Sequence, residues 1–221
     1  ELTVSARLTV NAAGPWADKV LAMAQDGTPS HRLIRAKGIH LITRPLTDGS
    51  AALAMFVGGG HFFVLPWRGH TIIGTTDDVF EGAPDDVSPT QADIAKMLAA
   101  VNKGLPSAKL TADDVIHAYA GVRPLIDESE PGAKGGSYKR SRKAEIIDHA
   151  EDGEANLLSA LGGKWTTSRH VAAQAVDMAE RKLGRKPRRA ATDRTPLGGQ
   201  SIGNFKAYVA RMTAAHRRID P

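Results

Sequence analysis

Two glycines, a lysine and two threonines stand close together in the segment LGGKWTT, residues 161–167. Glycines at a turn between a strand and a helix let a ligand approach the backbone. The first turn of the helix then offers amide N–H groups and the positive end of the helix dipole. Lys164, Thr166 and Thr167 add a cation and two hydroxyl groups at the same place. The segment therefore suits an anion or an electron-rich ring edge, although an ordinary tight turn with a solvated lysine accounts for the same residues.

A nucleotide-phosphate loop is excluded by counting positions. Such a loop has a glycine five positions before the glycine that precedes its lysine, and a hydroxyl residue directly after the lysine. Leu158 and Trp165 occupy these two positions. An anion bound by this segment would have to be held in another way.

Two strand–turn–helix units stand at opposite ends of the pattern. Residues 157–161 read as a strand before the Gly162-Gly163 turn, and the apolar face of the helix after it consists of Ala172, Ala175, Val176, Ala179 and Leu183. At the start of the chain, the strand-like alternation is formed by Val4, Ala6, Leu8 and Val10. Pro15 follows Gly14 as the first residue of a helix, whose apolar side holds Trp16, Val20, Leu21 and Ala24.

The region between these units is rich in β-strand patterns. Five runs read as strands, namely GIHLIT, HFFVLPW, HTIIGTT, VIHAYAGV and AEIID. One helix interrupts them: residues 88–91 form a capping box with proline at the first helical position, and the apolar spacing continues to Leu105. We expect an α/β (α+β) fold in which the strands of the two outer units lie side by side, so that Gly14 and Gly163 face one crevice.

The composition excludes or disfavours several classes of function. The chain has 221 residues, 42% hydrophobic and 24% charged, without cysteine, which excludes disulfides and cysteine-bound metals. No apolar run approaches the roughly 18–20 residues of a spanning helix. A basic run at residues 180–194 carries much of the net charge of +5. It holds no aromatic residue for stacking on bases, so a solvated linker is favoured over nucleic-acid binding. The histidines show no metal-ligand spacing, and we expect no metal.

Five segments, in their order and separations, carry a family resemblance. They are NAAGPWADKV (11–20), KGIHLI (37–42), LPW with IIGTTD (65–77), GVRPL (121–125) and LGGKWTT (161–167). Together they resemble the FAD-dependent, quinone-linked glycerol-3-phosphate dehydrogenases of the D-amino-acid-oxidase-like superfamily, over residues 8–199.

The resemblance implies a partial FAD-binding Rossmann-like domain with an inserted antiparallel, β-rich substrate domain. The flavin-binding part would comprise residues 1–30 and 155–184, and the substrate domain residues 31–154. Residues 185–221 would be a basic linker and the start of a truncated helical domain. The G-x-G-x-x-G turn of the family is missing, because Phe63 stands where the third glycine should follow Gly58-Gly59-Gly60. We therefore expect a segment of a longer flavoenzyme that is inactive by itself.

The implied reaction is oxidation of sn-glycerol 3-phosphate to dihydroxyacetone phosphate. A hydride passes from C2 to N5 of FAD, and the electrons pass to a membrane quinone. The resemblance also implies a cytoplasmic protein in peripheral contact with the inner membrane, and it allows a homodimer.

Three residues are candidates for the chemistry. Arg123 has the fork geometry that clamps an anionic or carbonyl oxygen, and the resemblance aligns it with the substrate arginine; a salt bridge to Asp127 or Glu128 is the structural alternative. His40 titrates near neutrality and is the candidate base for the hydroxyl proton, with a structural role as the alternative. The resemblance assigns Lys164 three roles, in catalysis, in substrate binding and in flavin binding.

The remaining roles come from the resemblance. The cofactor-binding set is Gly14, Pro15, Trp16, Gly162, Gly163, Lys164, Trp165, Thr166 and Thr167. The substrate-binding set is His40, Thr76, Asp77, Arg123 and Lys164. Trp165 replaces a usual leucine, and we expect its ring to face the core or the wall of the flavin domain.

Three other functions stay open. A glycerol-3-phosphate oxidase would use the same scaffold and pass electrons to oxygen. An amine oxidase of the D-amino-acid-oxidase type would use the arginine to clamp a carboxylate, which the intact GVRPL and GGKWTT segments disfavour. A non-catalytic remnant would fold or dimerise without FAD.

Overall fold

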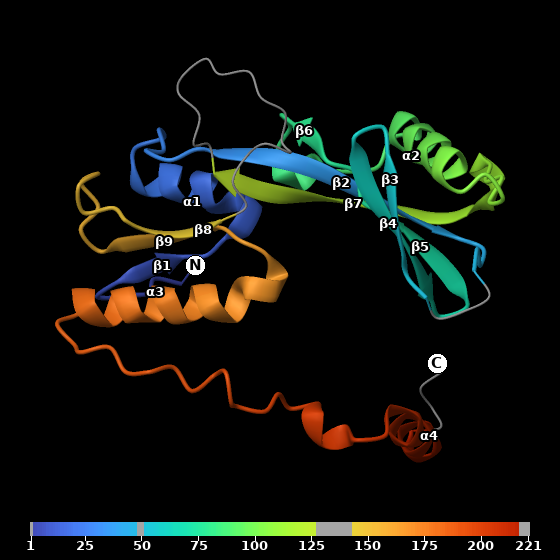
Figure 1. The fold of residues 1–221 in the computed structure, drawn as a ribbon. Coiled ribbons are helices and arrows are strands. Elements are labelled where there is room, and N and C mark those ends of the chain that lie inside the picture. The colour runs from blue at the N-terminus through green and yellow to red at the C-terminus, as the bar shows by residue number, and fades with distance from the viewer. Residues whose placement is uncertain (1, 48–50, 127–142, 217–221) are drawn as a thin grey trace.

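Two β-sheets share the chain in a computed structural model that describes residues 2–47, 51–126 and 143–216 (Figure 1). The smaller sheet has the order β1-β9-β8, formed by β1 (Thr9–Asn11), β9 (Leu157–Gly162) and β8 (Ala144–Asp148). In it β1 runs parallel to β9, and β8 runs antiparallel to β9. The predicted pairing of the two outer strand–turn–helix units is therefore confirmed.

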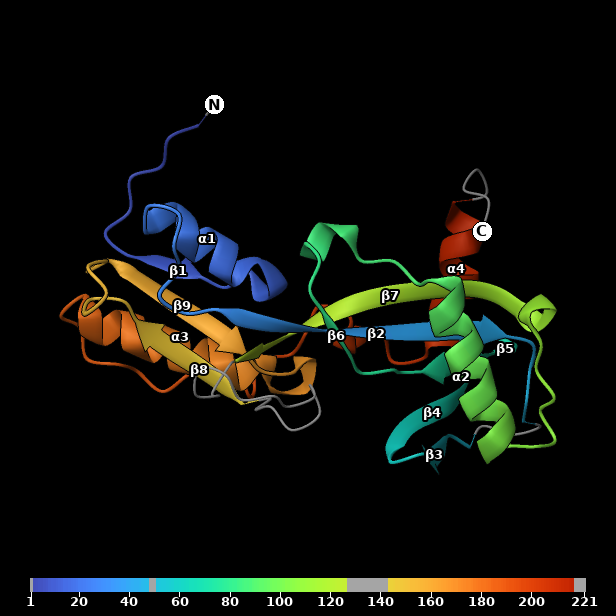
Figure 2. The ribbon, with the colours of Figure 1, turned by 90° about the horizontal axis from the view of Figure 1, so that it is seen from above.

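The larger sheet is antiparallel, with the order β3-β4-β5-β2-β6 and β7 on the other edge of β2. Its strands are β2 (Leu33–Thr43), β3 (Leu53–Val57), β4 (Gly60–Trp67), β5 (His70–Gly74), β6 (Asp78–Phe80) and β7 (Val115–Ile126). Seen from above, β2 and β7 run from the side of the smaller sheet into the larger one (Figure 2). These two long strands therefore connect the two parts of the site described below.

Helices cover both sheets. α1 (Ala17–Ala24) and α3 (Ser168–Lys182) lie on opposite sides of the smaller sheet (Figure 1), each preceded by a 3₁₀ turn, Gly14–Trp16 and Trp165–Thr167. α2 (Gln91–Gly104) covers one face of the larger sheet, and α4 (Phe205–Ala215) follows the basic linker. Further 3₁₀ turns lie at Pro84–Asp86, Ala112–Asp114 and Gln200–Ile202. Among the described residues no helix has the length and apolar character needed to cross a bilayer.

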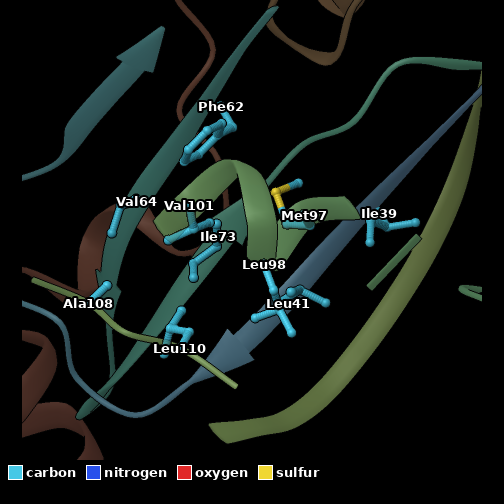
Figure 3. Packing of buried hydrophobic residues seen from close by; sticks show 10 residues of the cluster. All are labelled: Ile39, Leu41, Phe62, Val64, Ile73, Met97, Leu98, Val101, Ala108 and Leu110. Atoms are coloured by element: carbon cyan, nitrogen blue, oxygen red, sulfur yellow. The ribbon is translucent and has the colours of Figure 1, made fainter. Parts of the chain in front are cut away.

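The main core lies between α2 and the larger sheet (Figure 3). Ile39 and Leu41 of β2 are buried there against Val101 of α2. Because successive strand residues point to opposite faces, His40 must lie on the other face of the sheet. Side chains of β2 therefore point alternately to the face that packs against α2 and to the opposite face, which carries the candidate base His40.

Three local expectations were wrong. The first strand is only Thr9–Asn11, so Val4, Ala6 and Leu8 of the predicted alternation lie before it, and Val4 is exposed. α2 is capped two residues later than predicted, because Thr90 Oγ1 accepts from the amide of Asp93 while the Asp93 carboxylate accepts from the amide of Thr90. Residues 144–148 belong to the smaller sheet, although the predicted boundary at 154 put them with the substrate domain.

A buried polar chain links the strands of the smaller sheet. His149 is fully buried, with its Nδ1 2.7 Å from Asp152 Oδ2 and its Nε2 2.8 Å from Ser159 Oγ. Asn11 Nδ2 donates to Ser159 Oγ at 3.3 Å and to the carbonyl of Ala17. Both hydrogen bonds of His149 form when its Nδ1–H donates to the Asp152 carboxylate and its Nε2 accepts from the Ser159 hydroxyl. Among the described residues His31 brings a third ligand-type atom within 4.8 Å of this pair. Since both nitrogens of His149 already have hydrogen-bond partners, we interpret the group as a structural network.

Replacing His149 by alanine is expected to destabilise the protein strongly. The change leaves the hydroxyl of buried Ser159 without one partner, which costs about 1–3 kcal/mol, and the cavity adds to that cost. Chemical denaturation measures the free energy of unfolding. The matched control is His31→Ala, because that side chain is 39% exposed and its loss should cost much less. Equal losses for the two variants would contradict this account of the network.

Candidate functional site

The two glycine turns open on one groove of about 880 Å³. Gly14 and Pro15 line it from the first turn, and Gly162, Gly163 and Lys164 line it from the second. The groove follows from the parallel pairing of β1 and β9, because the two turns then begin at the carboxyl ends of neighbouring strands, on the same side of the smaller sheet.

The backbone of both turns depends on glycine. Gly14, Gly162 and Gly163 have φ values of +54°, +68° and +85°, which side-chain-bearing residues rarely adopt. A Cβ on Gly162 would also lie 2.5 Å from the carbonyl oxygen of Lys143. A Cβ on Gly14 would meet no atom within 4 Å, so there the backbone itself is accessible to a ligand.

Small apolar side chains of α3 form one wall of the groove. Ala172, Ala175, Val176 and Ala179 all line it. Of these only Ala175 is buried, and Val176 is 57% exposed. The apolar face predicted for this helix therefore faces the groove, and a flat apolar group fits against it.

The structure places the other members of the predicted cofactor set differently. Trp165 lines the groove and is 95% exposed, so of the two expected positions of its ring, the core and the wall of the flavin domain, the core is excluded. It belongs to the 3₁₀ turn Trp165–Thr167, in which no residue is buried. Thr167 caps this turn, since its Oγ1 accepts from the amide of Lys164 and donates to the carbonyl of the same residue. Thr166, Thr167 and Trp16 are not among the groove-lining residues.

Arg123 belongs to β7 and lines the groove. Its Nη1 donates to the Thr76 carbonyl at 3.2 Å and to Asp77 Oδ1 at 3.1 Å. Its Nη2 donates to Thr75 Oγ1 at 2.8 Å and to the Thr76 carbonyl at 3.2 Å. Asp77 is thus an ion-pair partner, whereas the predicted partners Asp127 and Glu128 lie outside the described residues. Residues 75–77 hold the guanidinium in place, and that is the role in which the structure shows Thr76 and Asp77.

Gly38 provides the space in which this guanidinium lies. A Cβ on Gly38 would collide with Nη2 of Arg123 and with Oγ1 of Thr75. Gly38 stands on the same face of β2 as His40, two residues away. It belongs to the KGIH motif, but the motif alone gave it no role, because its contact with Arg123 depends on the register between β2 and β7.

His40 lies between two neighbours that fix its ring. It stacks on Tyr119, with ring centroids 5.0 Å apart and an angle of 11° between the planes. On its other side lies Gly74, where a Cβ would collide with the imidazole. Burial lowers the pKa of His40 below its usual 6.5, and the positive charge of Arg123 lowers it further. The imidazole is therefore neutral at neutral pH and can accept a proton.

We expect an NMR titration of the His40 imidazole to give a midpoint below pH 6.5. Replacing Arg123 by glutamine should raise this midpoint but leave it below 6.5, because burial is the larger cause. The unfolded chain then binds more protons than the folded one at acidic pH. The free energy of unfolding should consequently fall as the pH drops through 6.5 towards the pKa of His40 in the folded protein. Above pH 6.5, His40 should add no pH dependence to the free energy of unfolding.

A midpoint at or above 6.5 in the unmodified protein would contradict this environment for His40. The His40→Gln variant serves as the stability control, since it should lose this part of the pH dependence and keep the rest.

The fold and the site define a class of flavoprotein. A family model described as FAD dependent oxidoreductase matches residues 1–173. The chain therefore belongs to the family of FAD dependent oxidoreductases, and the resemblance found in the sequence is confirmed.

Individual relatives are more specific. A glycerol-3-phosphate dehydrogenase from Synechocystis sp. is 35% identical over 87% of this chain and 36% of its own length. A D-erythritol 1-phosphate dehydrogenase from Brucella abortus is 34% identical over 77% of this chain and 33% of its own length. The solved structure of glycerol-3-phosphate dehydrogenase from Bacillus halodurans complexed with FAD has a TM-score of 0.70 and 28% identity, covering 94% of this chain and 40% of that one. This chain spans about a third of the length of these curated relatives.

The groove residues fit the flavin that the family requires. The volume lies within the roughly 300–1,000 Å³ of cofactor and ligand sites. The apolar wall of α3 suits a flat ring, and the accessible backbone of Gly14 permits close approach. Lys164 adds a cation beside the positive end of a helix, which suits a ring that becomes negatively charged on reduction. These four features belong to one surface.

Proposed function

We propose that the protein containing this chain oxidises sn-glycerol 3-phosphate to dihydroxyacetone phosphate with FAD as the hydride acceptor. The observation that carries the proposal is the position of Arg123. It lines the groove and lies on the same face of the larger sheet as His40, which is not among the groove-lining residues. Burial and the charge of Arg123 lower the pKa of His40, so the anion clamp at the groove has a neutral base near it. The names of the relatives support glycerol 3-phosphate as the substrate.

Each residue has a separate task in this proposal. His40 accepts the proton of the C2 hydroxyl as the C2–O bond becomes a carbonyl. Arg123 binds the phosphate or the oxygen that develops charge, and residues 75–77 keep its guanidinium aimed. Lys164, Gly162 and Gly163 of the second turn and Gly14 and Pro15 of the first turn are the residues that would hold the flavin in the groove. When bound, FAD supplies the acceptor for the hydride that leaves C2.

The finer parts of the proposal concern electrons and location. We propose a quinone as the acceptor. We also propose that the whole protein is cytoplasmic and in peripheral contact with the inner membrane, where a quinone is available, and a homodimer is compatible with this. An oxidase that passes the electrons to oxygen is the alternative. Anaerobically reduced protein mixed with oxygen or with a soluble quinone analogue separates the two, because the acceptor that reoxidises flavin faster is the assigned one.

An anaerobic titration of the FAD-saturated protein tests the reaction. Glycerol 3-phosphate should bleach the visible flavin absorbance, whereas glycerol should not, since it has no phosphate for Arg123 to bind. D-erythritol 1-phosphate should bleach the flavin more slowly if the substrate assignment is right. Bound flavin that stays oxidised with glycerol 3-phosphate would contradict the proposal, and faster bleaching by the erythritol phosphate would transfer the assignment to the longer polyol.

A further inference from the structure

Side chains from the region of the larger sheet form hydrogen bonds with the Gly14–Trp16 turn. Arg35 of β2 donates from Nε and Nη2 to the carbonyl oxygen of Pro15, at 3.0 and 2.8 Å. Its Nη2 also donates to Asp18 Oδ1 at 2.6 Å. The side chains of Arg35 and Asp18 are only 13% and 12% exposed, so this is a nearly buried ion pair joined to a backbone carbonyl.

A second hydrogen bond holds Trp16, the next residue of the turn. Trp16 Nε1 donates to Asp85 Oδ2 at 3.0 Å, and Asp85 belongs to the 3₁₀ turn before α2. This hydrogen bond lowers the pKa of Asp85, and Lys19 contributes to the lowering. The turn that lines one side of the flavin groove is therefore held by residues outside the smaller sheet.

Arg35 also belongs to the strand that carries the chemistry. On β2 it precedes Gly38 by three residues and His40 by five, and it pairs with Pro124, the residue after Arg123. One strand thus contacts both the flavin-side turn and the substrate arginine. Arginine suits this position because its planar fork can give two hydrogen bonds to one carbonyl and keep its charge when buried.

We propose that Arg35, together with Asp18, is a positioning residue that sets the Gly14–Trp16 turn for flavin binding and fixes it relative to Arg123 and His40. The proposal rests on the assignment of the groove to FAD. A purely structural arginine would affect folding stability alone, whereas a positioning arginine affects flavin affinity beyond any loss of stability.

The neighbouring residue Lys37 offers a matched control. Lys37 lies on β2 two residues from Arg35 and forms an ion pair of similar burial with Asp93 of α2, at 2.7 Å and with side chains 13% and 14% exposed. This pair ties β2 to α2 and not to the flavin-side turn. Lys37→Met should therefore change stability without changing the affinity for FAD.

The experiment compares Arg35→Lys, Lys37→Met and the unmodified sequence, each in the whole protein that contains this chain. Arg35→Lys keeps the charge next to Asp18 but loses the fork on the Pro15 carbonyl. We expect its dissociation constant for FAD, measured by flavin fluorescence, to rise about tenfold, which corresponds to the loss of one charge-assisted hydrogen bond. Thermal unfolding of both variants measures stability, and amide hydrogen exchange at Gly14 and Trp16 without FAD measures the order of the turn.

Three outcomes decide the proposal. A selective loss of FAD affinity in Arg35→Lys, with faster exchange at Gly14, supports it. An unchanged affinity in Arg35→Lys, or equal losses in both variants, overturns it. If the whole protein that contains this chain binds no FAD, the proposed function fails by that result, and unchanged exchange at Gly14 in Arg35→Lys would separately overturn the positioning role.

Discussion

Replacing Arg123 by alanine is expected to lower the rate constant of flavin reduction by glycerol 3-phosphate about 10²–10³-fold, as for loss of one donor to developing charge. The guanidinium is a cationic group that β7 presents to the groove, and residues 75–77 aim it with four hydrogen bonds. Stopped-flow absorbance under anaerobic conditions measures the rate. Arg123→Lys should lose a smaller part of it, because it keeps the charge but loses the fork.

The control for this change is an arginine on the exposed linker. Arg194 has a side chain that is 71% exposed, and Arg194→Ala should leave the rate unchanged. A rate in Arg123→Ala within twofold of the unmodified protein would show that substrate is bound elsewhere.

Gly38→Ala is expected to reduce the rate as strongly as Arg123→Ala, although no charged group is removed. The added methyl group collides with Nη2 of Arg123 and with Oγ1 of Thr75, which are joined by a hydrogen bond, so at least one of these side-chain ends must shift. We expect the guanidinium to leave its position. Because catalysis depends on geometry at the level of about 1 Å, the displacement costs about 10²-fold in rate.

The matched control lies directly across the strand pair. Gly121 of β7 pairs with Gly38 of β2, and a Cβ on Gly121 would meet no atom within 4 Å. Gly121→Ala should keep both the rate and the flavin affinity. Full activity in Gly38→Ala, measured beside this control, would mean that the observed position of Arg123 is not the one used in the reaction.

Local signals in the sequence were sufficient for the two turns. Gly14-Pro15 and Gly162-Gly163 each interrupt a strand-to-helix transition, and their positive φ values explain why glycine stands there. Parallel pairing of the strands before them followed from the rule for strand–turn–helix units. The crevice between the turns was therefore predictable without a structure.

Contacts between distant segments were not predictable in the same way. One partner of Arg123 is Asp77, 46 residues earlier, a pairing that no local pattern in the sequence suggested. The steric role of Gly38 requires the register of β2 on β7, which no local pattern encodes. The exposure of the Trp165 ring was not predicted, because hydrophobicity alone does not say which side of a 3₁₀ turn faces the groove.

The position of the flavin is the central claim, and a glycine-resolved amide NMR spectrum during titration with FAD tests it most directly. The amide signals of Gly14, Gly162 and Gly163 should shift together as FAD is added, because these three residues line one groove. Gly58 and Gly59, in the turn between β3 and β4, should stay in place. Shifts confined to Gly58 and Gly59, or no shift of the three groove glycines at saturating FAD, would contradict the assignment of this groove to the flavin.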